Sequence, residues 1–139
     1  MKPPDEVTRQ LVRQWVAKAD EDRNVTQKLP YDDPQCLAPI AYHAQQCAEK
    51  FLKAFLVLHG IEFTWTHDLR KLLDLIAGVD AALASSLAFA EDLTRFASET
   101  RYPVLAPSAP KPAVTEEKAR NAVELAEKVR EIMLKVLPT

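Results

Sequence analysis

The chain has 139 residues, which predicts a single domain over residues 1–139. Hydrophobic residues make up 47% of it and charged residues 27%, a composition typical of a soluble domain with one core. The formal net charge is only −2, so no global positive field favours nucleic acids, and such binding would need a local patch. No apolar run is long enough for a membrane span or a secretory signal, so we expect a cytoplasmic protein.

Cysteine and histidine are too few to indicate a metal site. Cys36 and Cys47 are the two cysteines and lack CxxC spacing, and histidine occurs three times. We therefore predict no metal ion and no cofactor. Both cysteines are interpreted as small buried hydrophobes or partly exposed thiols.

Glycine and proline positions predict long helices separated by short breaks, because both residues interrupt helices. The first helix is expected over about Asp5 to Lys28, with Asp5 as its cap. Its apolar side is formed by Val7, Leu11, Trp15, Val16 and Ala19. A second helix is expected from about Gln35 to His59, followed by Gly60, a residue suited to the left-handed end position.

The second half of the chain predicts three more helices. The third begins near Thr66–Asp68 and ends at Gly78. The fourth runs from about Asp80 to Glu99, with apolar residues at helical spacing, namely Leu83, Leu87, Ala90, Leu93 and Ala97. A proline-rich loop follows, and Thr115 caps the last helix. Because no stretch alternates with a period of two, we predict an all-α fold, an up-and-down bundle of four to five helices.

The second helix carries a narrow polar stripe opposite its apolar face. Spacings of three, four and three place four polar residues on one edge, namely His43, Gln46, Lys50 and Lys53. One interpretation is an ordinary amphipathic helix whose polar face is solvated. The other is a groove that holds a phosphate or a base, because lysine offers a point charge and glutamine and histidine can hydrogen-bond a base edge.

Three strings follow one another in an order that points to a family. They are YHAQQCAEKFLKAFLVLHG, THDLRKLLDLI and ETRYP, the last standing before the proline-rich loop. Together they resemble the prokaryotic HEPN domain over nearly the whole chain. The resemblance implies a helical bundle, often a homodimer. It also implies a partner, because such domains are frequently encoded beside a minimal nucleotidyltransferase as a two-component or toxin–antitoxin pair, and some bind nucleotides.

The sequence departs from the ribonuclease branch of that family. Its hallmark is an arginine followed four to six residues later by histidine, whereas Arg95 is followed after six intervening residues by Tyr102. Tyrosine, with an unperturbed pKa of about 10, is a poor general base. We therefore predict no catalytic residue. Arg95, Arg101 and Tyr102 remain candidates for clamping a phosphate and stacking a base. The alternative is that Arg101, Tyr102 and His67 only cap or pack against helices.

Our leading hypothesis is a non-catalytic nucleotide- or RNA-associated module, dimeric and partnered with a nucleotidyltransferase. ATP, GTP and RNA are the expected ligands, and the candidate binding residues are His43, Gln46, Lys50, Lys53, His67, Arg95, Arg101 and Tyr102. This hypothesis requires that the basic and aromatic groups converge on one cleft. The alternatives are a metal-independent endoribonuclease toxin and a plain dimerisation or interaction module, which would expose apolar positions on the first two helices.

Overall fold

A computed structural model describes residues 4–97 and 113–138, and every regular element in these ranges is a helix. The elements are α1 (Glu6–Lys28), α2 (Pro34–Leu58), α3 (Leu69–Ala77), α4 (Ala81–Ser86), the 3-10 helix η1 (Ala88–Ala97) and α5 (Glu116–Leu134). The predicted all-α bundle is confirmed. None of the helices in the described ranges combines the length and the apolar composition that crossing a membrane requires.

Local sequence signals fix most helix ends. The carboxylate of Asp5 accepts a hydrogen bond of 2.7 Å from the Thr8 backbone N–H, which lowers the pKa of Asp5 and caps α1. The hydroxyl oxygen of Thr115 accepts a hydrogen bond of 3.1 Å from the Lys118 backbone N–H and caps α5. Gly60, just past the end of α2, has a positive φ of 66°, as expected for a glycine at this position. The predicted caps of the first and last helices are therefore confirmed.

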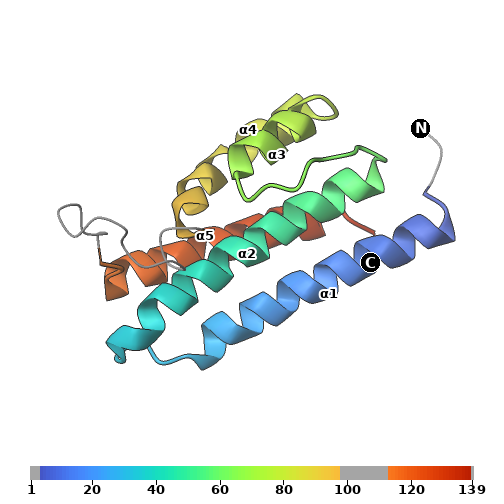
Figure 1. Ribbon diagram of the computed structural model, residues 1–139. Coiled ribbons are helices and arrows are strands. Elements are labelled where there is room, and N and C mark those ends of the chain that lie inside the picture. The colour runs from blue at the N-terminus through green and yellow to red at the C-terminus, as the bar shows by residue number, and fades with distance from the viewer. Residues whose placement is uncertain (1–3, 98–112, 139) are drawn as a thin grey trace.

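Helix α2 is the centre of the bundle. Figure 1 shows it between α1 and α5, with α3 and α4 across its remaining side, and it packs against α1, α3, η1 and α5. The helical wheel predicts one apolar face on this helix, and its members are Ala44, Cys47, Phe51, Ala54, Phe55 and Leu58. All of them are buried except Leu58, which is partly buried. Because neighbours cover α2 on several sides, its polar residues also contact protein: of the candidates on this helix, Gln46 and Lys53 are buried and His43 and Lys50 are half-buried.

The predicted fourth helix is not one helix. Helix α4 ends at Ser86, and the chain continues from Ala88 as the 3-10 helix η1. The physical reason lies in the spacing of the apolar residues, which falls on every third position: Leu87, Ala90, Leu93 and Phe96, all buried. A 3-10 helix has three residues per turn, so this spacing keeps all four on one face.

The apolar side predicted for α1 is buried only in part. Ala19 is fully buried and Trp15 and Val16 are partly so, but Val7 is 67% exposed and Leu11 43%. The first turns of α1 lie beyond the end of α2 (Figure 1), so little of the bundle is left to cover them. The prediction is therefore wrong for the first two turns.

Candidate functional site

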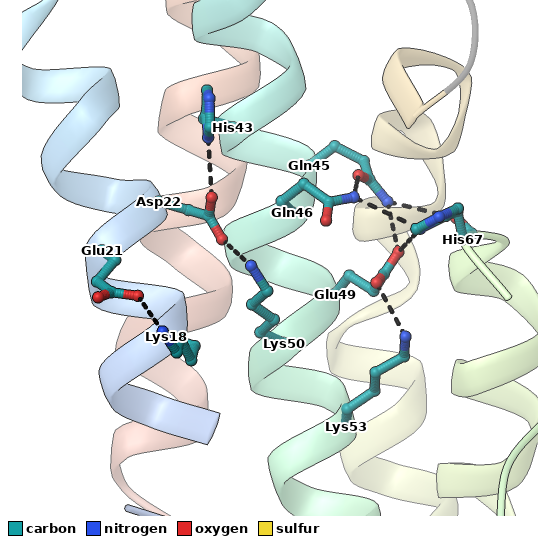
Figure 2. Close-up of polar contacts among 10 residues, drawn as sticks. All are labelled: Lys18, Glu21, Asp22, His43, Gln45, Gln46, Glu49, Lys50, Lys53 and His67. Atoms are coloured by element: carbon teal, nitrogen blue, oxygen red, sulfur yellow. Dashed lines mark hydrogen bonds and ion pairs between the residues drawn. The ribbon is translucent and has the colours of Figure 1, made fainter. Parts of the chain in front are cut away.

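The polar side chains of α2 form two clusters that face different neighbours (Figure 2). His43 and Lys50 point towards Asp22 on α1, and we call these three residues the Asp22 cluster. On the other side of α2, a second group surrounds a buried glutamate. This Glu49 cluster consists of Gln45, Gln46, Glu49, Lys53 and His67.

The Asp22 cluster joins the first two helices. Asp22 is buried, and its two carboxylate oxygens lie 2.8 Å from His43 Nδ1 and 2.5 Å from Lys50 Nζ. Both partners are half-buried. An acid taken out of water needs such partners to offset its desolvation, so this cluster explains how α1 can carry an aspartate on its buried side.

The ion pair of the Glu49 cluster is more deeply buried than the contacts of the Asp22 cluster. Glu49 and Lys53 are each only 2% exposed, and Lys53 Nζ donates a hydrogen bond of 2.9 Å to Glu49 Oε2. The other carboxylate oxygen, Oε1, lies 2.8 Å from His67 Nδ1 and accepts a hydrogen bond of 3.0 Å from Gln45 Nε2. One buried carboxylate thus joins α2 to the segment that precedes α3.

The contacts of His67 assign its tautomer. The Glu49 carboxylate, ion-paired with Lys53, can only accept, so the proton must be on His67 Nδ1. Gln46 Nε2 is 3.5 Å from the same nitrogen, too far to compete. Within the described residues His67 Nε2 makes no hydrogen bond, and it therefore remains available as an acceptor in the neutral ring.

Aromatic rings surround the buried ammonium group of Lys53. Its Nζ lies 5.0 Å from the ring centroid of Trp65, 5.6 Å from that of Phe63 and 5.9 Å from that of Trp15. Cation–π attraction of this kind is stronger when the cation is desolvated. The rings and Glu49 together compensate the buried charge, and they hold the segment between α2 and α3 against the bundle.

Arg95 lies in a separate cleft where η1 meets α5 and the start of α3. The cleft has a volume of about 530 Å³, and its walls include Asp68, Thr94, Arg95, Phe96 and Asn121. The guanidinium group of Arg95 is exposed and lies 4.8 Å from the Phe96 ring centroid. Among the described residues it forms no ion pair. Glu91 and Asp92 also line the cleft, so together with Asp68 three acidic side chains stand beside the one cation of its lining, Arg95.

Comparison with known proteins identifies the family. The family model for the HEPN domain matches residues 12–137. The chain belongs to the HEPN domain family. The crystal structure of TT1696 from Thermus thermophilus is similar to it, with a TM-score of 0.65 and 26% sequence identity over 89% of this chain and 96% of that one. A search among curated proteins gives no match.

The described candidate residues of this HEPN domain do not converge on one cleft. The Glu49 cluster contains Gln46, Lys53 and His67, whereas His43 and Lys50 belong to the Asp22 cluster. Arg95 lines the separate cleft, and Arg101 and Tyr102 lie outside the described residues. The interpretation of the α2 stripe as a solvated face does not hold for Gln46 and Lys53, because both are buried.

Sequence reasoning missed three residues that organise the site. Glu49 precedes Lys53 by four positions, a spacing that indicates a helical ion pair. Asp22 lies three positions after the buried Ala19, and so on the same side of α1. Trp65 carries no comparable signal, because its exposure depends on how the segment before α3 is placed.

Neither cysteine is a candidate nucleophile. Cys47 is buried, as predicted, and burial together with the nearby Asp22 and Asp20 raises the pKa of its thiol to about 12. Burial also raises the pKa of Cys36, which is half-buried. Both thiols therefore stay protonated near neutral pH, and only a thiolate is an effective nucleophile. Within the described residues, no three histidine, cysteine, aspartate or glutamate side chains are arranged to hold a metal ion.

Proposed function

We propose that this HEPN protein is a non-catalytic module that associates with a nucleotide or RNA and acts together with a second protein. A dimer that pairs with a minimal nucleotidyltransferase, in a two-component or toxin–antitoxin system, is what the resemblance to prokaryotic HEPN domains implies. Co-purification with such a transferase tests the partner. Because the described candidates do not converge on one cleft, the polar stripe of α2 no longer supports a ligand. The proposal rests on Arg95, which lines an open cleft and has no acidic ion-pair partner among the described residues.

The cleft suits a ligand that carries phosphate. A guanidinium group presents a planar fork of donors to phosphate oxygens, and Thr94 and Asn121 add groups that can hydrogen-bond. The volume falls within the range typical of small-molecule sites, roughly 300–1,000 Å³. Asp68, Glu91 and Asp92 oppose an anion, so we expect weak binding that depends on Arg95 and changes with the salt concentration.

Titration of ATP, GTP and a short single-stranded RNA into the purified protein tests the ligand. Arg95→Ala is expected to weaken binding by about 10- to 150-fold, because it removes a charge-assisted hydrogen bond of roughly 1.5–3 kcal/mol. Arg13→Ala, which removes an exposed cation paired with Glu6 on α1, is the matched control and should bind normally. Saturation by none of the three ligands would reject the proposal.

One observation favours a second function, that of a plain interaction module. Val7 and Leu11 are exposed four positions apart on α1 and align with Trp15. Beside Trp15 lies a mostly apolar groove of about 480 Å³, edged by Lys18 and Lys50. Apolar residues aligned in this way on a helix surface are typical of a protein interface.

Leu11→Asp distinguishes the two functions. If α1 is an interface, this variant should lose self-association or partner binding in light scattering while its thermal stability changes little. Val136→Asp is the matched control. The helical spacing of the last helix predicts that Val136 is buried, but it lies just after the end of α5 and is 40% exposed. Lost association with unchanged ligand titrations would favour the interaction module. Unchanged association in Leu11→Asp would reject α1 as the interface.

A further inference from the structure

Trp65 is the most exposed large apolar side chain among the described residues, at 84%. It lies in the segment between α2 and α3, where Glu62 and Thr64 are exposed polar neighbours. The partly buried rings of Trp15 and Phe63 lie around the same Lys53 ammonium group, so aromatic surface continues beside the indole. An exposed indole ring is a surface on which a flat ring can stack.

The exposed indole is held in place from inside the fold. Lys53 Nζ lies 5.0 Å from the Trp65 ring centroid, and the His67 ring stands nearly perpendicular to the indole at 72° and 6.3 Å. Glu49 binds both Lys53 and His67. A ring fixed before binding loses little conformational entropy when a ligand stacks on it, so the buried ion pair prepares this surface for binding.

His67 adds a hydrogen-bonding group beside the ring. Its Nδ1–H is engaged by Glu49, so its Nε2 accepts when the ring is neutral, and its side chain is 36% exposed. A ligand that stacks on Trp65 can therefore donate an N–H to His67. Nucleobases combine a planar ring with such donors on their edges.

We propose that Trp65 and His67 form a nucleobase-binding site, with the base stacked on the indole and an N–H of the base donated to His67 Nε2. The inference rests on the proposed association with nucleotides or RNA and names the part of the ligand that is held here. Asp68, the residue after His67, lines the Arg95 cleft. The base site and the phosphate candidate thus lie at the same end of α3, an arrangement that suits single-stranded RNA.

A variant with a single tryptophan tests the site. The chain has two tryptophans, and Trp15→Phe keeps an aromatic ring beside Lys53 while leaving Trp65 as the only indole. We expect adenosine, cytidine and short single-stranded RNA to quench the fluorescence of this variant in a saturable way, and ribose 5-phosphate not to. Equal quenching by ribose 5-phosphate, which lacks a base, would overturn the proposal.

Substitutions at the two residues give the second arm of the test. Trp65→Ala is expected to weaken RNA binding about 5- to 150-fold, the range found for the loss of one stacked base, and to leave the circular dichroism spectrum unchanged. His67→Phe, which keeps a ring but removes Nε2, is expected to weaken it several-fold.

Each contrary outcome has a distinct meaning. RNA binding that survives Trp65→Ala but is lost in Arg95→Ala would overturn the base site and leave the proposed function standing. Absence of binding by every ligand would overturn both. If Trp65→Ala instead abolished binding of a transferase partner and left RNA affinity unchanged, the indole would be a protein contact and the base site would be rejected.

Discussion

Glu49→Ala is expected to lower the free energy of unfolding by about 3–5 kcal/mol, because it leaves a buried charge without its partner. Lys53, at 2% exposure, would keep its ammonium group inside the fold with the aromatic rings as its remaining contacts. The Nδ1–H of His67 would lose its acceptor as well. Urea denaturation followed by circular dichroism measures the loss.

Two further variants separate the effect of burial from the effect of charge on the free energy of unfolding. Glu21→Ala removes the acid of an exposed ion pair with Lys18 on α1 and should cost less than about 1 kcal/mol. The double change Glu49→Leu with Lys53→Met replaces the ion pair by apolar groups and should recover much of the loss. A loss below about 1 kcal/mol for Glu49→Ala would contradict the view that this pair is desolvated.

Helix ends could be predicted because their signals are local. Asp5 and Thr115 cap helices through their own side chains, and Gly60 adopts a backbone conformation that other residues rarely do. The break at Leu87 also had a local signal in the spacing of three between buried apolar residues. The same spacing is also compatible with a longer α-helix, because spacings of three and four both occur on one face of such a helix.

The site was harder to predict because it depends on what covers each helix. A helical wheel of α2 separates polar from apolar edges, but it cannot tell that the segment before α3 covers one polar edge and α1 another. Three residues of the polar stripe therefore divide between two acids, His43 and Lys50 to Asp22 and Lys53 to Glu49. The fourth, Gln46, donates a hydrogen bond to Gln45 Oε1. The wheel places Glu49 near Lys53, yet nothing in it indicates that both are buried.

The exposure of aromatic and apolar side chains could not be predicted from the sequence for a related reason. Val7 is exposed because α1 begins beyond the end of α2, an offset that the pattern of α1 alone does not contain. Trp65 is exposed although its neighbour Phe63 packs against Trp15. Such differences between adjacent aromatic residues arise from the path of an irregular segment, for which the sequence has no periodic signal.

Asp22→Asn is expected to destabilise the fold by about 2 kcal/mol, since Asp22 is the buried acid that joins α1 to α2. The amide keeps the size of the side chain but removes the charge that His43 and Lys50 share. The loss should be smaller than for Glu49→Ala, because both partners are half-buried and can reach water. Asp20→Asn, two positions away on α1 and paired with Arg130 at a more exposed site, should cost less than about 1 kcal/mol in the same urea titration. Equal losses in the two variants would mean that charge, and not burial, decides the contribution of these acids, and the same reasoning would then fail for Glu49.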